Sequence, residues 1–346
     1  MCVKPSGPGR ASSDPELPPN PRAVLMADLD ISFVIVNWNT RALLLQCVAA
    51  IYETVKSLSI EVIVVDNGST DDSVQAVQNT FPQVRCIVNS ENKGFGAANN
   101  QAFRVMRGRY ALLLNTDATL KPRAAQSLFA FMESHPQTGM ACGQLLNPDG
   151  SKQNSHATFP SLLGLAVNES LLKWLLPGKY PSKYRDYKEP LPIDSCVGAC
   201  MIVRQSAMEE VGLFDERYFF FFEETDWARQ FWQGGWQVHF VPQAQIIHAQ
   251  GQSAGANALA RKLFYYSRYQ YLHKWHPSQF GVMKAVILLR LALNVVLNSA
   301  AVLLTAGLVQ NSRFRCQRYW QLLTWHFSAC PFPMARPAAA ENKAHE

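Results

Sequence analysis

The stretch Tyr110-Ala-Leu-Leu-Leu-Asn-Thr-Asp117 joins a short apolar run to a polar turn that ends in an acid. Such a run, followed at once by polar residues, is typical of a buried strand that leads into a loop. Few structural reasons place Asn-Thr-Asp directly after so apolar a strand, although a turn cap is one of them. The segment predicts a buried strand with Asn115 and Asp117 at its end.

Other strands and helices alternate around this segment. We expect three earlier strands, at Ile31–Val36, Ile60–Val65 and Val84–Val88. We expect helices near residues 40–56, 72–80, 94–107 and 122–134. This alternation predicts an α/β fold with a doubly wound, mostly parallel sheet. Ligands bind outside the carboxyl ends of the strands in such sheets, and three of the predicted strands end in polar loops there.

The second half of the chain gives weaker signals. Residues 147–192 look rich in loops, with one apolar helical piece near Leu162–Leu176. An apolar run at Asp194–Val203 and two short strands at Val238–Val241 and Ile246–Ile247 follow before His248. We expect these segments to complete the domain that contains the sheet.

Composition limits the classes of partner. The chain has 346 residues, 48% of them hydrophobic, which is enough for a sizeable core. Its net charge of +6 suits nucleotide phosphates or an acidic membrane surface. No dense Lys/Arg stripe interleaved with aromatics marks the core region, so no nucleic-acid partner is expected. The 8 cysteines are scattered through apolar runs, which favours a reducing cytoplasm.

Four regions are expected along the chain. Residues 1–29 are rich in Pro, Ser and Gly and read as a disordered extension, and residues 30–258 form the sheet domain. Residues 259–325 read as amphipathic or hydrophobic helices, and residues 326–346 as a flexible tail.

One segment of the third region is nearly long enough to cross a membrane. Leu291–Val309 contains 19 residues without a charge, with basic residues on both sides. A spanning helix needs about 20 apolar residues, so this segment fits either a span or a helix in the membrane interface.

Several acids and one histidine are candidates for chemistry. Asp66 follows a predicted strand, where it could bind a ribose or base, or form an ordinary Asx turn. Glu223, Glu224 and Asp226 lie within four residues after four phenylalanines. Crowded carboxyls near apolar surface acquire raised pKa values, which suits a base, although acids also favour a helix N-terminus. His248 ends an apolar strand, where it could take part in the site or serve only as a hydrogen-bonded structural residue.

Together these segments resemble the inverting family 2 glycosyltransferases of GT-A fold, and within them the bacterial rhamnosyltransferase-like branch that builds surface polysaccharides. The resemblance covers residues 31–255. It rests on segments 36–39, 65–71, 92–99, 113–118, 198–201, 212–216, 223–227 and 247–248.

The resemblance implies roles for individual residues. The expected substrate-binding residues, most of them beside the nucleotide, are Asn37, Asn39, Asp66, Asn92, Gly94, Asn115 and Asp226. Asp117, with help from His248, would hold Mg²⁺ or Mn²⁺. Asn115 replaces the first acid of the usual DxD-like motif, so the sugar diphosphate is expected to supply most of the metal's oxygen ligands.

The catalytic base is expected in the pair Glu223-Glu224. Relatives carry Glu-Asp at these two positions, and the longer side chain at the second leaves open which of the two acts as base. Gln230 is another departure, because many relatives carry Arg there.

The implied reaction is transfer of a sugar, rhamnose among the candidates, from a dTDP-, UDP- or GDP-sugar to a lipid-linked or polysaccharide acceptor. By the same analogy the C-terminal helices would dock on the cytoplasmic face of the inner or plasma membrane, as a peripheral or single-span protein. The alternatives are a non-catalytic nucleotide- or glycan-binding relative and a nucleotidyltransferase. A nicotinamide enzyme is disfavoured, because no G-x-G-x-x-G follows the first strand.

Overall fold

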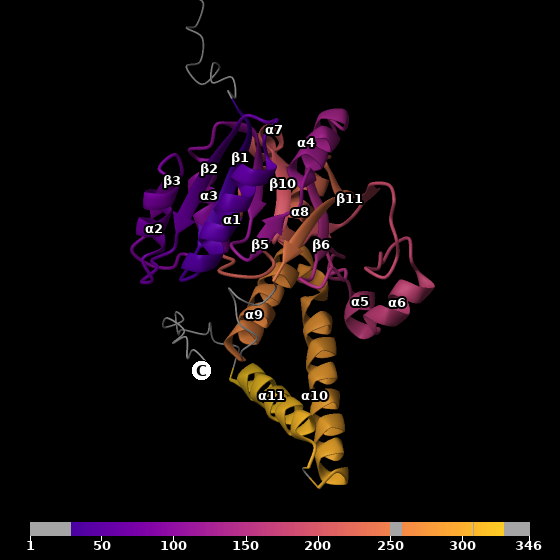
Figure 1. Cartoon of the computed structure of the whole chain (residues 1–346). Coiled ribbons are helices and arrows are strands. Elements are labelled where there is room, and N and C mark those ends of the chain that lie inside the picture. The colour runs from indigo at the N-terminus through magenta and orange to yellow at the C-terminus, as the bar shows by residue number, and fades with distance from the viewer. Residues whose placement is uncertain (1–28, 250–257, 307, 329–346) are drawn as a thin grey trace, which may run out of the picture.

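The computed structural model describes residues 29–249, 258–306 and 308–328. Nine strands of the described chain form one twisted sheet in the order β3-β2-β1-β4-β10-β6-β11-β5, with β8 paired to β11 (Figure 1). Their bounds are β1 Leu29–Asn37, β2 Ile60–Asp66, β3 Arg85–Val88, β4 Gly108–Leu114, β5 Ala118–Leu120, β6 Thr138–Leu146, β8 Leu191–Pro192, β10 Cys200–Arg204 and β11 Gln237–His248. A separate pair joins β7, His156–Ala157, to β9, Ser195–Cys196.

The sheet is mostly parallel, as predicted. Strands β1 to β4 run the same way, and β10 lies antiparallel between β4 and β6. Strand β6 therefore shares the direction of β4, and β11 pairs with it in parallel. Only β5, β8 and β10 run against the rest within this sheet of the described chain.

Helices cover both faces of the sheet, which confirms the doubly wound α/β prediction. Their bounds are α1 Arg41–Thr54, α2 Ser73–Thr80, α3 Phe95–Phe103, α4 Ala124–Ser134, α7 Gln205–Val211 and α8 Glu223–Gln233. Alternate residues of β1 point to opposite sides. Phe33 packs into the core with α1, α2 and α4, and Val34 packs into the core with α3, α7 and α8.

The C-terminal helices form a third layer beyond the carboxyl ends of the parallel strands (Figure 1). They are α9 Ala258–Trp275, the 3₁₀ turn Pro277–Gln279, α10 Phe280–Leu304 and α11 Gln310–Phe327. A separate apolar cluster joins them to the sheet domain through Tyr218 and Phe222. Pro277–Leu304 is long and apolar enough to cross a membrane, with a mean hydropathy of 2.1 over its best window.

Two expectations for the second half were wrong in detail, and a central strand before it was not predicted. The two short strands before His248 are one strand, β11, with an irregular register between Val241 and Gln245. The helical piece near residues 162–176 is two helices, α5 Leu162–Ala166 and α6 Glu169–Leu175, because Asn168 caps a new start. Strand β6 was not predicted, although it lies in the middle of the sheet. The expected N-terminal extension, apart from Leu29, and most of the expected tail fall outside the described residues.

Candidate functional site

Asn37 and Asp66 end neighbouring parallel strands, and the sheet register places them side by side. The Asn37 amide donates to Asp66 Oδ1 at 2.8 Å. The Ser69 hydroxyl also donates to Oδ1, at 2.6 Å, and its backbone N–H donates to Oδ2 at 2.9 Å. The Asp66 carboxylate thus caps the turn that follows β2. Oδ1 accepts two of these hydrogen bonds and Oδ2 accepts one, so Oδ2 has more room to accept a bond from a ligand.

The loop after β1 is tied to both neighbouring loops. Asn39 has a left-handed backbone, with φ 52°, and its side chain accepts from the Thr70 N–H at 2.7 Å. The Thr40 hydroxyl donates to Asn37 Oδ1 at 2.8 Å and lies 3.0 Å from the hydroxyl of Thr116. A chain of polar contacts therefore links the expected nucleotide edge to the Asn-Thr-Asp turn.

Gly94 lies where no side chain fits. Its φ is +88°, and an added Cβ would lie 2.5 Å from the carbonyl oxygen of Phe219. Asn92 Oδ1 accepts from the Gly94 N–H at 2.9 Å, and the Asn67 amide donates to the Gly94 carbonyl at 3.1 Å. This turn therefore brings the start of α3 against the loop that precedes the acidic cluster.

Asp117 and His248 meet through backbone pairing. Strand β11 pairs with β5 so that His248 lies opposite Ala118, and the N–H of Ala249 donates to the carbonyl of Asp117 at 2.9 Å. His248 Nε2 lies 3.4 Å from Asp117 Oδ1. That oxygen is buried and accepts no hydrogen bond, so it retains free acceptor capacity beside the imidazole.

Gln153 fixes which nitrogen of His248 faces Asp117. Its amide nitrogen donates to the His248 carbonyl at 2.6 Å and to Asn147 Oδ1 at 2.7 Å, so its carbonyl must be the atom 2.9 Å from His248 Nδ1. His248 Nδ1 therefore carries hydrogen and donates, so Nε2 is the nitrogen that faces Asp117, and in the tautomer with hydrogen on Nδ1 alone it offers a lone pair there.

A buried carboxylate oxygen and an imidazole lone pair that face each other repel unless a positive charge lies near them. This donor set fits Mn²⁺ or Mg²⁺, with one oxygen and one nitrogen ligand. The described residues bring together no group of three His, Cys, Asp or Glu side chains that could hold a metal. The protein would thus supply two ligands and leave the other positions to a bound diphosphate.

The turn before β10 joins the Asp117 turn to the acidic cluster. The Asn115 N–H donates to the Ala199 carbonyl at 3.0 Å. On the other side of that turn, a Cβ on Gly198 would lie only 3.9 Å from the side chain of Glu224. The described contacts of Asn115 are made by its backbone, and its expected contact with substrate remains a prediction.

Glu223 and Glu224 begin α8 and differ in exposure. Glu223 is buried, at 4% exposure, and its Oε2 has no hydrogen-bond partner, whereas Glu224 is partly accessible. Burial, together with the charge of Glu224, raises the pKa of Glu223 well above its usual range. Burial raises the pKa of Glu224 to about 7. Burial therefore favours the protonated form of Glu223, and Glu224 is poised to gain or lose a proton near neutral pH.

The residues just before this pair are strained. Phe221 and Phe222 both have a left-handed backbone, with φ of 68° and 70°. Such conformations cost on the order of 1–3 kcal/mol each and persist only where packing holds them. Phe264 of α9 packs against both rings, with centroids 5.6 and 5.3 Å away. Helix α9 therefore helps to set the position of the acidic pair.

Asp226 is fully buried and surrounded by donors. Lys274 Nζ lies 2.7 Å from its Oδ2, and Trp275 Nε1 donates to its Oδ1 at 2.6 Å. Gln230 and Tyr218 donate to it as well, at 2.6 and 3.2 Å. These contacts fasten α8 to α9 and give Asp226 a positioning role, and its expected contact with substrate remains a prediction.

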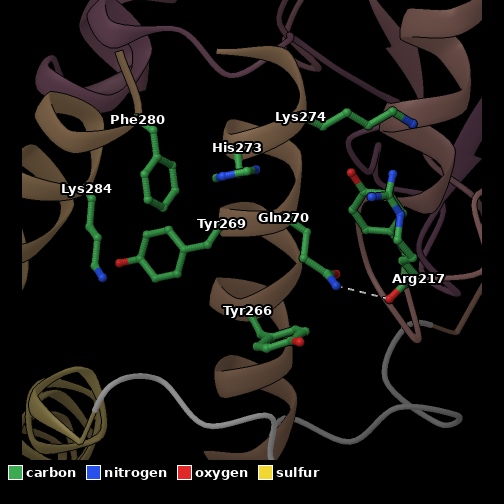
Figure 2. Close-up of a pocket in the computed structure, with 9 residues that line it drawn as sticks. Arg217, Tyr266, Tyr269, Gln270, His273, Lys274, Phe280 and Lys284 are labelled. Atoms are coloured by element: carbon green, nitrogen blue, oxygen red, sulfur yellow. Dashed lines mark hydrogen bonds between the residues drawn. The ribbon is translucent and has the colours of Figure 1, made fainter. Parts of the chain in front are cut away.

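A cavity of about 370 Å³ lies along α9, next to this network. Figure 2 shows Arg217 and Lys274 on one side of α9, and Phe280 and Lys284 on the other. Arg217 and Lys274 both contact Asp215, and they hold the pKa of that carboxyl well below its usual range. Much of the positive charge around this cavity is therefore already balanced by carboxylates.

Sequence reasoning missed the residues that support the site. Gln153 lies in a stretch that reads as loop, and no pattern marks it as a partner of His248. The contact between Thr40 and Thr116 joins loops 76 residues apart in sequence. Lys274 lies in a segment for which the sequence predicts only amphipathic or hydrophobic helices.

Comparisons with known proteins identify the family of this chain. The model of glycosyl transferase family 2 matches residues 32–212. N-acetylglucosaminyl-diphospho-decaprenol L-rhamnosyltransferase of Mycobacterium tuberculosis is 30% identical over 210 residues, which are 57% of this chain and 68% of that protein. The hexosyltransferase Agl10 of Haloferax volcanii, assigned to low-salt glycan biosynthesis, is 24% identical and aligns over 58% of this chain and 60% of its own.

One solved structure supports the fold. The crystal structure of GalNAc-T7 with UDP, GalNAc and Mn²⁺ superposes with a TM-score of 0.54 at 13% identity, over 88% of this chain and 58% of that chain. The predicted GT-A fold is thereby confirmed, with a mostly parallel sheet and an added apolar helix near the C-terminus. The chain belongs to glycosyl transferase family 2.

Proposed function

We propose that this chain is an inverting, metal-dependent glycosyltransferase that moves a sugar from a nucleotide diphosphate to a hydroxyl of a lipid-linked or polysaccharide acceptor. The observation that carries the proposal is the buried Asp117 Oδ1, which accepts no hydrogen bond and faces His248 Nε2 at 3.4 Å. In this family such a pair, at the carboxyl end of the sheet, would hold Mn²⁺ or Mg²⁺ against the donor. A bound cation would neutralise the charge that develops on the departing diphosphate.

The nucleotide of the donor would lie along the edge built by Asn37, Asn39, Asp66, Asn92 and Gly94. The linked side chains of Asn37, Ser69 and Asp66 hold this edge in one arrangement before a ligand arrives. Asp66 Oδ2 would accept a hydrogen bond from the base. Preorganised polar groups lower the ordering cost of binding.

Glu224 is the base in this proposal. It is the more accessible acid of the pair, and its pKa of about 7 suits removal of a proton near neutral pH. The acceptor oxygen forms a bond to the anomeric carbon from the face opposite the diphosphate, and the bond from carbon to diphosphate oxygen breaks. The acceptor proton passes to Glu224, and the anomeric configuration inverts. The raised pKa of Glu223 favours its protonated form, in which it would add no opposing negative charge beside the base.

The proposed acceptor follows from the relatives. The mycobacterial enzyme is named for a diphospho-decaprenol acceptor and for rhamnose, so a polyprenyl diphosphate acceptor and a dTDP-sugar are the first pair to test. The apolar helix near the C-terminus and the basic residues around it support a location at the cytoplasmic face of a membrane.

The test is release of nucleotide diphosphate from a panel of dTDP-, UDP- and GDP-sugars, with Mn²⁺ or Mg²⁺ and a polyprenyl-diphosphate-linked acceptor sugar. We expect turnover with at least one donor, and loss of about a hundredfold or more in Asp117→Ala. Asp149→Ala is the matched control, because Asp149 is an exposed acid in a turn. Unchanged activity in Asp117→Ala refutes the metal role, and no turnover with any donor favours a binding protein.

A further inference from the structure

A second cavity, of about 300 Å³, lies among the three C-terminal helices. Its lining combines one residue of α9, two of α10 and three of α11: Arg261, Asn294, Asn298, Arg315, Arg318 and Tyr319. Each of these side chains ends in a polar group, although α10 is otherwise strongly apolar. Three helices thus present guanidinium, amide and phenol groups to one space.

The positive charge of this cavity is uncompensated. Its lining includes no carboxylate, and within the described residues none of the three arginines forms an ion pair with an acid. The sequence has no Asp or Glu at all between Trp227 and Ala340. This cavity differs from the one in Figure 2, whose Arg217 and Lys274 are balanced by Asp215 and Asp226.

Three arginines that line one cavity without an acid are suited to a phosphate. Arginine presents a planar set of N–H donors that matches two phosphate oxygens at once. The amides of Asn294 and Asn298 donate back to the helix, to the carbonyls of Arg290 and Asn294 at 2.8 and 2.7 Å. Their amide oxygens remain able to accept from a hydroxyl or amine attached to the phosphate.

The surroundings of the cavity indicate that this phosphate belongs to a lipid. On the same helix as the two asparagines, Leu293, Val296 and Leu297 are 52, 63 and 66% exposed. Near the end of α10, Leu303 and Leu304 are 80 and 89% exposed. A phosphate next to an extended apolar face is the chemistry of a phospholipid at the membrane interface.

We propose that this cavity binds the phosphate of an anionic phospholipid, with the exposed face of α10 against its acyl chains. The site would fix the depth and orientation of the C-terminal helices at the membrane. The inference rests on the proposed membrane location but not on sugar transfer, so binding experiments test it separately from catalysis.

The experiment is co-sedimentation of the full chain with vesicles of phosphatidylcholine alone or mixed with phosphatidylglycerol, at constant salt. Arg318→Gln and Arg315→Gln remove lining arginines. Arg313→Gln is the matched control, because it removes the same charge from an exposed position of α11 outside the cavity. We expect the partition coefficient on anionic vesicles to fall about fivefold in the control, from one lost charge. In the lining variants it should fall about thirtyfold, because a charge-assisted hydrogen bond is lost as well.

Asn298→Leu separates the site from simple apolar insertion. It leaves the charge unchanged and makes α10 more apolar, so binding driven by apolar surface alone would become stronger. The proposed site predicts weaker binding to the anionic vesicles. Circular dichroism of each variant checks that the helices are intact. Arg318→Lys keeps the positive charge but lacks the planar set of N–H donors, so it should bind at an intermediate level.

Equal losses in Arg318→Gln and Arg313→Gln would overturn the proposal, as would stronger binding by Asn298→Leu. Inorganic phosphate is the remaining arm of the test. If the wild type binds it in calorimetry and the lining variants do not, while all of them partition equally onto the anionic vesicles, the cavity takes a soluble phosphate and the lipid assignment is wrong.

Discussion

Replacing Lys274 by Met tests how strongly the C-terminal layer supports the catalytic domain. Its ammonium group lies 2.7 Å from Asp226 Oδ2 and 3.0 Å from Asp215 Oδ2. Methionine has a similar length and fills the same space without the charge. The substitution would leave the fully buried Asp226 with three neutral donors, from Tyr218, Gln230 and Trp275.

The expected loss in the free energy of unfolding is about 2–3 kcal/mol. Removing one member of a buried ion pair costs about 3–5 kcal/mol when the other charge is stranded. The remaining donors still solvate Asp226, and the Lys274 side chain is 26% exposed, which lowers the cost towards that of one charge-assisted hydrogen bond. Because Asp226 lies two residues after Glu224, we also expect turnover to fall by more than donor binding does.

Urea denaturation followed by tryptophan fluorescence measures the first effect, and steady-state kinetics measures the second. Lys262→Met is the matched control, since it makes the same change on α9 at a lysine outside this network. We expect it to shift stability by less than about 0.5 kcal/mol. A Lys274→Met chain as stable and as active as the control would refute the idea that this contact holds α8 in place.

Three further substitutions probe the site itself. The rate of the wild type should rise with pH through about 7 and then level off, because Glu224 must lose its proton to act as base. Glu224→Gln should abolish this rise and lower kcat by about 10²–10⁴. An ionisation near pH 7 that persists in the variant would show that another group causes the rise. Gln153→Leu should weaken Mn²⁺ binding by about 10–100-fold, because His248 is no longer held in one tautomer. Electron paramagnetic resonance titration in the presence of nucleotide diphosphate measures this affinity. An unchanged affinity would show that Gln153 does not support the metal site. Gly94→Ala should raise the dissociation constant of the nucleotide, measured by calorimetry, and lower the melting temperature. The reason is that the new Cβ would lie 2.5 Å from the Phe219 carbonyl oxygen. A melting curve like that of the wild type would show that the turn can move to make room.

Strands β1 to β4 could be predicted because each of them contains a short apolar run followed by a polar turn. Asn37, Asp66 and Asp117 could be placed at one edge of the sheet on that basis alone. Strand β6 could not, because Thr138–Leu146 mixes glycine, glutamine and cysteine, and its position is set by pairing with β10 and β11 rather than by its own pattern.

The candidate site was only partly predictable for a similar reason. Sequence motifs mark the groups that are proposed to do chemistry, such as Glu224 and His248. The groups that orient them depend on contacts across the fold: Gln153 is 95 residues from His248, and Lys274 is 48 residues from Asp226. Spacing along the chain contains no information about such pairs.

The two left-handed phenylalanines before α8 have a consequence for how the enzyme could be divided. The sheet domain holds the proposed donor edge and the Asp117 turn, whereas the rings of Phe221 and Phe222 pack against α9. In a chain cut after β11 we expect the nucleotide edge to persist and the strained turn before the proposed base to relax towards ordinary backbone angles. Under the proposed function, donor binding and acceptor activation are thus separable, and helix α9 supports only the second of them.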